Sequence, residues 1–219
     1  MYGAETRASL REFMRVERRE IRRLLEALTP EQWQTASLCD GWTVRDLLAH
    51  LVAWDDLLIY RTRREHVRLF VGFMVLYAQS AASMARLNRR LYARTRHLGP
   101  DELLDRFARD DGRELKWLFD GSNPGAHLAE YVIHRHDIAR PLGSTCEVPN
   151  ERMTAALDGA LKLPSVRLRA RWLLRNKELH ATDLDWAHGR GPRVDARAAD
   201  ILMALAGRDT IRQLCRSGA

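Results

Sequence analysis

Apolar residues recur every three or four positions through much of the first 140 residues, and this spacing constrains the fold more than any other feature of the chain. The first such stretch covers about residues 10–28, where Glu17 is the one charged interruption of the apolar stripe. Spacing of this kind is typical of amphipathic helices that pack their apolar faces on a shared core. We therefore expect a mainly helical protein.

Capping residues and turns divide this part of the chain into separate helices. Thr43, with Asp46 three residues later, is typical of a helix start, and the pair Gly99-Pro100 is typical of a helix end. Long helices with short connections predict a four-helix bundle over residues 1–143. The expected helices cover roughly residues 10–28, 44–63, 67–96, 101–118 and 125–140.

The residue pattern changes after Gly143. A helix is expected over about 149–161, a strand within 177–186 and a final helix over about 196–206. This mixture predicts a small α/β unit over residues 148–219. Because the linker between the two parts is short, we expect them to pack together with a cleft between them.

The net charge of +7 raises the question of nucleic-acid binding. Only three of the 36 basic residues are lysine, and the arginines of the first helix alternate with glutamates. Such alternation indicates ion pairs on a solvated helix face rather than a track of one charge sign for phosphates. No zinc-finger or RNA-binding motif accompanies it. We expect no nucleic-acid partner, although the surplus positive charge suits attraction of a small anionic substrate.

Several features predict a cytoplasmic protein that does not enter a membrane. No signal peptide is visible at the start of the chain, and the longest apolar run, residues 69–78, is too short to span a bilayer. Cys39, Cys146 and Cys215 are scattered without the spacing of a metal or redox motif, which suits reduced thiols. No sequence feature gives Cys39 a base, so a catalytic role is not expected for it.

Three residues on two expected helices have the side chains of a metal site. Glu130 and His134 are four residues apart, so both project from one helix face. His50 lies on a different helix, and facing helices of a bundle commonly bring such ligands together. Two imidazoles and one carboxylate suit Zn²⁺ or an iron-like ion, and three protein ligands leave a position for water or substrate.

The residue types around this trio leave other interpretations open. The spacing also fits a surface ion pair, and His50 also fits a buried core histidine. Asp137, three residues after His134, is placed to orient its imidazole. His127 lies on roughly the same helix face and is a reserve ligand, whereas His136 is expected to face solvent.

Three segments carry a resemblance to a known family. Residues 33–51, WQTASLCDGWTVRDLLAHL, resemble the signature of the DinB-like mycothiol-dependent maleylpyruvate isomerase family. Residues 130–143, EYVIHRHDIARPLG, are similar to the second metal motif of that family. Residues 181–186, ATDLDW, and 205–208, LAGR, look like its small C-terminal domain. The motifs are specific together and weak singly.

The resemblance implies a DinB-like four-helix bundle that binds Zn²⁺ through His50, Glu130 and His134, the same residues that the spacing indicates. In the family, an arginine in the last helical region lies at the active-site cleft, and the matching residue here is Arg208. The resemblance also implies mycothiol as a thiol cosubstrate. Zinc lowers the pKa of a bound thiol and holds it as a thiolate nucleophile.

The implied function has more than one form. Thiolate addition to a maleyl-type substrate leads to cis-trans isomerisation, and attack on another electrophile leads to S-transfer. The expected partners are a small anionic or electrophilic substrate and a low-molecular-weight thiol. The alternative is a non-catalytic metal-binding or regulatory protein of the same fold. Residues 66–96, which would line the pocket, match no known pattern, so the substrate stays open. The sequence does not indicate the oligomeric state.

Overall fold

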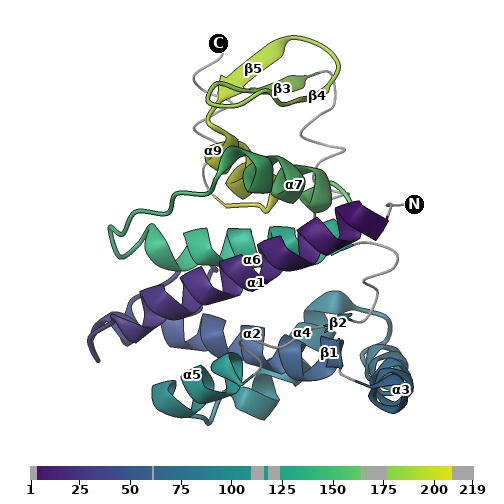
Figure 1. Cartoon of the computed structure of the whole chain (residues 1–219). Coiled ribbons are helices and arrows are strands. Elements are labelled where there is room, and N and C mark those ends of the chain that lie inside the picture. Colours follow the sequence, from purple (N-terminus) through teal and green to yellow (C-terminus); the bar gives the residue numbers. More distant parts are fainter. Residues whose placement is uncertain are drawn as a thin grey trace. The chain divides into compact units, whose positions relative to one another are not determined.

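The computed structural model describes residues 4–60, 62–109, 116–117, 124–163, 166 and 177–208. Within these residues the chain is mainly helical and has a small sheet in its C-terminal part, which confirms the predicted fold class (Figure 1). The chain divides into two compact units, one formed by Met1–Glu17 with Gly121–Ala219 and the other by Arg18–Asp120. The expected domains, 1–143 and 148–219, follow a different division and stay a prediction.

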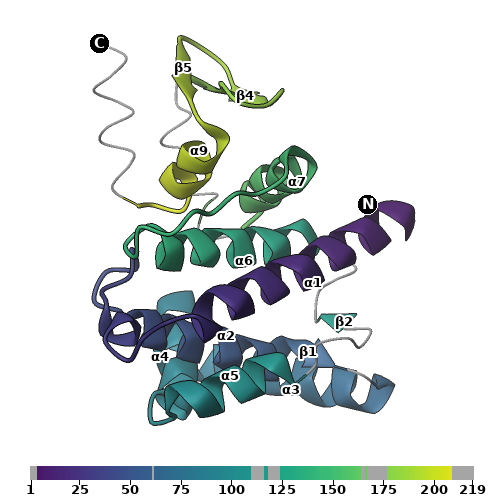
Figure 2. The same ribbon diagram turned by 60° about the vertical axis from the view of Figure 1, so that its left-hand side comes forward.

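The unit Arg18–Asp120 is built around one apolar helix, α2. Ten of its residues are buried, and it contacts α4 and α5 (Figure 2). The predicted start is confirmed: the Thr43 hydroxyl accepts from the Asp46 backbone N–H, and the Asp46 carboxylate accepts from the Thr43 N–H at 3.1 Å. The elements of this unit are the second part of α1 (Ala4–Glu26), η1 (Gln32–Gln34), α2 (Val44–Leu58), β1 (Ile59–Tyr60), α3 (Arg63–Gln79), α4 (Met84–Thr95), α5 (Pro100–Ala108) and β2 (Lys116–Trp117).

The expected single helix over 67–96 is wrong, because the chain forms α3 and α4 there. Ala81 and Ala82 have positive φ angles of 47° and 50°, outside the right-handed helical region, so the helix ends before them. Ser83 then caps α4 by accepting from the Arg86 N–H at 3.5 Å. The expected helix over 44–63 is also shorter, because β1 pairs with β2 immediately after Leu58.

Among the described residues, no single helix is long and apolar enough to cross a membrane. Only when α3 and α4 are joined does a helix pair reach that length and composition, and the pair is bent by 116° at its break.

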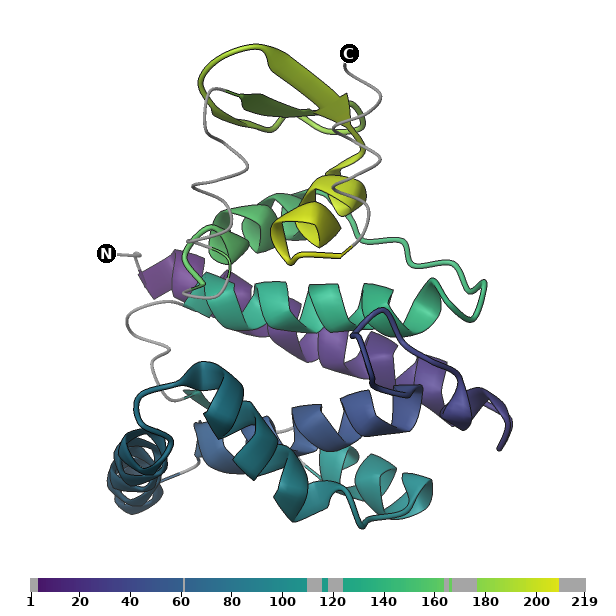
Figure 3. The same ribbon diagram turned by 180° about the vertical axis from the view of Figure 1, so that it is seen from behind.

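The other unit contains the predicted α/β part. In its three-stranded sheet, β3 is the central strand, antiparallel to β4 and parallel to β5, with Leu179 opposite His188 and Val194 (Figure 3). Helix α9 contacts β3, α6 and α7, so it connects the sheet to the helices of this unit. The elements are the first part of α1, then α6 (Pro124–Ala139), α7 (Asn150–Ala160), β3 (Glu178–Ala181), β4 (Ala187–Gly189), β5 (Arg193–Ala196) and α9 (Ala198–Leu205).

Glu17, the charged residue that interrupts the first apolar stripe, takes part in buried ion pairs. Glu17 is fully buried, and its carboxylate accepts hydrogen bonds from Arg135 at 3.1 Å and Arg152 at 2.5 Å. The next residue, Arg18, is 2% exposed, donates to Asp55 and to the Phe107 carbonyl, and lies over the Phe107 ring. Both charges are therefore neutralised inside the protein, as buried charges must be.

Helices α6 and α7 approach each other closely where both have glycine. A Cβ atom added to Gly159 would lie 1.9 Å from the carbonyl oxygen of Gly125. No side chain fits between two backbones at that distance. The packing of α7 on α6 therefore depends on glycine at this position.

We predict that Gly159→Ala lowers the free energy of unfolding by about 3 kcal/mol, because the added methyl forces the two helices apart. The matched control is Gly72→Ala in α3, where an added Cβ meets nothing within 4 Å. That change should raise stability by about 1 kcal/mol through helix propensity alone. Urea unfolding of both variants measures the change in the free energy of unfolding. Equal changes for Gly159→Ala and Gly72→Ala would contradict the close approach of α6 and α7.

Candidate metal centre

Helix α6 brings two of the predicted ligands together. Glu130 and His134 are one turn apart, and the distance from His134 Nε2 to Glu130 Oε2 is 3.3 Å. The imidazole is nearly buried, whereas 42% of the Glu130 side chain is exposed. The pair therefore presents a nitrogen and an oxygen donor on one helix face, with the carboxylate open to solvent.

A second carboxylate holds the other side of the imidazole. His134 Nδ1 lies 3.0 Å from Asp137 Oδ2, so the expected orienting contact is present. Arg208 binds the same carboxylate through two nitrogens, with Nε donating to Oδ1 at 2.6 Å and Nη2 donating to Oδ2. The third guanidinium nitrogen donates to the Ala206 carbonyl at 3.2 Å. Arg208 thus fixes the residue that orients His134.

The charge of Asp137 determines which nitrogen of His134 carries the proton. Burial favours a raised pKa for Asp137, but hydrogen bonds from Arg208 and His134 hold that pKa far below its usual range. An ionised carboxylate only accepts hydrogen bonds, so His134 Nδ1 must carry the hydrogen. In neutral His134, Nε2 then has its lone pair directed toward Glu130, which is the tautomer that a metal ligand requires.

His50, the third predicted ligand, has aromatic surroundings in the unit Arg18–Asp120. It lies on α2 and is 8% exposed. The centroid of its ring is 4.9 Å from that of Trp42 and 6.3 Å from that of Trp54, both in edge-on contacts. Trp42 stacks in turn on Tyr92 at 5.2 Å. These rings restrict the orientation of the His50 imidazole.

The loop before α2 positions Trp42. Ser37 and Trp42 close the loop, since the Ser37 N–H donates to the Trp42 carbonyl at 2.8 Å and the Ser37 hydroxyl donates to the same oxygen at 2.9 Å. Gly41 has a φ of 75°, a conformation that favours glycine. The Trp42 N–H donates to the Cys39 carbonyl at 3.0 Å. The motif that resembles the family signature is thus a tight turn followed by a capped helix.

Tyr92, which stacks on Trp42 beside His50, is a residue that sequence reasoning missed. Its hydroxyl donates to Asp46 Oδ1 at 2.7 Å. Burial and the nearby Asp46 raise the pKa of Tyr92. For Asp46, burial favours a raised pKa, but hydrogen bonds from Tyr92 and Thr43 lower it below the usual value. No local signal marks Tyr92, because its partners lie more than 40 positions earlier.

The expectation that His136 faces solvent is wrong. The residue is 3% exposed, and no hydrogen-bond partner for either ring nitrogen is found in the described part of the chain. Burial is the main cause that lowers the pKa of His136 to about 4, and the charges of Arg140 and Arg135 act in the same direction. Residues 131–139 are all buried, so this part of α6 has no solvent face for His136 to occupy.

The remaining predicted residues are placed as follows. His50 belongs to the unit Arg18–Asp120, and Glu130, His134 and Arg208 belong to the other unit. The set of three metal ligands and the binding of a carboxylate ligand by Arg208 therefore stay predictions. His127, the reserve ligand, lies on α6 and is half-buried.

Two cysteines lie in described loops. The Cys39 N–H donates to the Ser37 hydroxyl at 3.1 Å. Cys146 follows α6, and its pKa is raised to about 11, with burial as the main cause. Arg135 and Arg140 oppose this rise, and Glu17 adds to it. The Cys146 thiol is therefore protonated at neutral pH.

We predict that Asp46→Asn lowers the free energy of unfolding by about 1 kcal/mol at pH 7, because it removes a charged acceptor at the start of α2. The lowered pKa of Asp46 means that this stabilisation is present above the unfolded-state value near 3.8 and is lost as pH falls through the folded-state pKa. Thermal unfolding from pH 7 to pH 3 should show the difference from wild type shrinking at the acidic end. If the difference in stability between wild type and Asp46→Asn stays constant over this pH range, the charge of Asp46 is not what stabilises the start of α2.

Comparison with known proteins gives matches in sequence and in structure. Residues 14–139 match a family described as Mycothiol maleylpyruvate isomerase N-terminal domain. A crystal structure of a mycothiol-dependent maleylpyruvate isomerase is similar, with a TM-score of 0.57 and 15% identity, over 93% of this chain and 90% of that one. A histidine-to-alanine mutant of such an enzyme gives 0.55 and 13% over the same shares. No curated protein matches in sequence. At these identities, the structural likeness establishes the fold.

Proposed function

The chain belongs to the family described as Mycothiol maleylpyruvate isomerase N-terminal domain, and we propose from this premise that it is a metal- and thiol-dependent enzyme. The substrate would be a maleylpyruvate-like acid that undergoes cis-trans isomerisation, or an electrophile that accepts the thiol. Mycothiol is the thiol that the family name suggests. The observation that carries the proposal is the series of contacts from Arg208 through Asp137 and His134 to Glu130.

The donors present on α6 fit a divalent metal. His134 Nε2 and the Glu130 carboxylate are the ligand types that Zn²⁺ takes in catalytic sites. The contact from Asp137 to the other imidazole nitrogen is the usual support of a metal-binding histidine. We propose His50 as the third ligand, as the family resemblance implies. A bound Zn²⁺ would lower the pKa of a thiol so that it is a thiolate at neutral pH.

The protein residues would orient the donors and keep their protonation states. Asp137 holds the proton on His134 Nδ1, and Arg208 keeps Asp137 ionised and fixed in place. With a maleyl-type substrate, thiolate addition would form a C–S bond and move the alkene electron pair onto the conjugated carbonyl, which leaves a single bond between the former alkene carbons. Rotation about this bond and loss of the thiolate would then give the trans isomer and return the thiolate.

The bidentate pairing of Arg208 favours a positioning role. Two guanidinium nitrogens of Arg208 bind Asp137 and the third binds a backbone carbonyl, so all three nitrogens already have protein oxygens as partners. Arg208 would then affect the reaction indirectly, because it holds Asp137, which in turn orients His134. A direct contact with the carboxylate of a substrate or thiol is the second role that we test below.

We predict about one Zn²⁺ or similar ion per chain in protein purified without chelator. Glu130→Ala and His134→Ala should each lower the metal content strongly, because each removes a proposed ligand. The control is His188→Ala, since His188 is exposed on β4 and should not affect the metal. Elemental analysis with melting temperatures gives the measurement. If Glu130→Ala and His134→Ala both fold and keep the metal content of the wild type, the metal does not bind at this site.

We predict that Arg208→Lys leaves the chain folded and lowers thiol-dependent turnover by roughly tenfold to a thousandfold, because lysine cannot reproduce a bidentate contact. A positioning role also predicts weaker metal binding and a lower kcat with little change in KM. A direct contact with an anionic ligand predicts a raised KM and unchanged metal binding. The control is Arg197→Lys, whose exposed side chain pairs with Asp183 at 3.2 Å. Unchanged turnover in Arg208→Lys would remove this residue from the site.

A non-catalytic metal-binding or regulatory protein is the second candidate. The observation that favours it is again Arg208, because an arginine fully bound by Asp137 and Ala206 also serves a purely structural metal site. Metal-loaded wild type that binds no low-molecular-weight thiol and shows no thiol-dependent turnover would support this candidate over the enzyme.

A further inference from the structure

A cleft lies inside the unit Arg18–Asp120, between α3 and the helices α2, α4 and α5. Its volume is about 530 Å³, within the range of small-molecule sites. Leu57, Leu69 and Leu76 contribute to its mostly apolar wall. None of its lining residues belongs to the proposed metal ligands, so the cleft is a separate feature of the fold.

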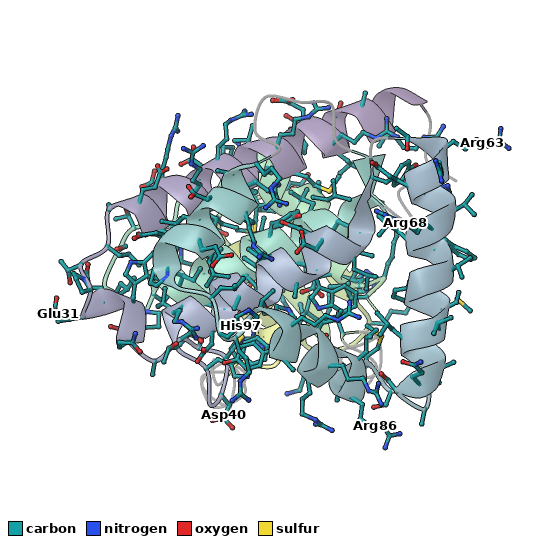
Figure 4. The ribbon with its side chains drawn as sticks, turned by 90° about the horizontal axis from the view of Figure 1, so that it is seen from below. Glu31, Asp40, Arg63, Arg68, Arg86 and His97 are labelled. Carbon is teal, nitrogen blue, oxygen red and sulfur yellow. The ribbon has the colours of Figure 1, made fainter. Side chains whose placement is uncertain are left out.

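Positive charge gathers at the cleft. Arg68, Arg94 and Arg106 line it from three different helices, and Asp56 is the acidic residue of the lining. Arg106 pairs with Glu102 at 2.9 Å and lies 3.9 Å from Asp56. For Arg68 and Arg94, the described ranges of the chain contain no ion pair. Figure 4 shows Arg68 projecting from α3 toward the neighbouring helices, whereas Arg63 at the start of α3 points away from them.

One of the residues that line the cleft is a glycine. Gly72 lies within α3 and lines the cleft, and an added Cβ would meet nothing within 4 Å. Glycine inside a helix costs about 1 kcal/mol relative to alanine. Neither a positive φ nor a close backbone contact requires glycine here. What the missing side chain provides is space beside the apolar wall.

We propose that this cleft binds a small amphipathic anion, with an apolar body along the leucines and a carboxylate facing Arg68 and Arg94. A guanidinium is well matched to a carboxylate, and neither of these arginines has a carboxylate partner among the residues that the structure describes. Apolar walls with a few placed polar groups are the usual construction of a small-molecule site. The proposal is independent of the metal and thiol chemistry proposed above.

Calorimetric titration of the full chain with octanoate tests the proposal, and octanamide serves as the uncharged probe of the same size. We expect saturable octanoate binding and at least roughly tenfold weaker octanamide binding, because a charged hydrogen bond is lost. Arg68→Gln and Arg94→Gln should each weaken octanoate binding by about tenfold. The control is Arg89→Gln, an exposed arginine of α4 outside the cleft, which should bind as wild type.

The shape of the cleft is tested separately by Gly72→Phe, which fills it without removing charge. This variant should fold and lose octanoate binding, and Ala78→Phe on the exposed part of α3 should keep it. Gly72→Met is the smaller substitution if the phenylalanine variant does not fold. No saturable octanoate binding, equal binding of octanamide, or wild-type binding in a folded Gly72 variant would each overturn the proposal.

Discussion

The buried charges of Glu17 and Arg18 fix the first helix in both compact units. The two residues are neighbours in α1, yet Glu17 is bound by Arg135 and Arg152 of one unit, and Arg18 is bound by Asp55 of the other. Removing one partner of a buried pair leaves an uncompensated charge, which costs on the order of 3–5 kcal/mol. Within each unit, polar contacts as well as the apolar face therefore fix the rotation of α1 about its own axis. Glu17, which interrupts the apolar stripe, is thus held by two arginines rather than exposed to solvent.

The same ion pairs orient the helix that carries the candidate metal ligands. Arg135 follows His134 directly on α6, so its bond to Glu17 fixes the rotation of α6 at the position where His134 lies. Asp137 and Arg208 then fix the imidazole itself. Glu130, one turn earlier, is the one exposed member of the group. A histidine held by a second carboxylate in this way is common at metal sites in proteins.

Local patterns in the sequence predicted part of this arrangement, and contacts between distant residues supplied the rest. The capped start at Thr43 and the one-turn spacing of Glu130 and His134 depend only on neighbouring residues, so they were visible in advance. The helix break at Ala81 was not, because alanine favours helix and its positive φ is set by the packed chain around it. The burial of His136 was missed for a related reason, since a helix buried on all sides has no polar face to recognise. Arg208 and Asp137 are 71 positions apart, and nothing local pairs them.

The raised pKa of Cys146 determines how the chain's own sulfur behaves beside a thiol partner. Thiol–disulfide exchange needs the thiolate, and a pKa of about 11 leaves roughly one Cys146 in ten thousand ionised at pH 7. An oxidised low-molecular-weight thiol would therefore form a mixed disulfide with this residue only slowly. The half-buried position of the loop thus protects Cys146 from covalent capture by the oxidised form of the cosubstrate that the protein is proposed to use.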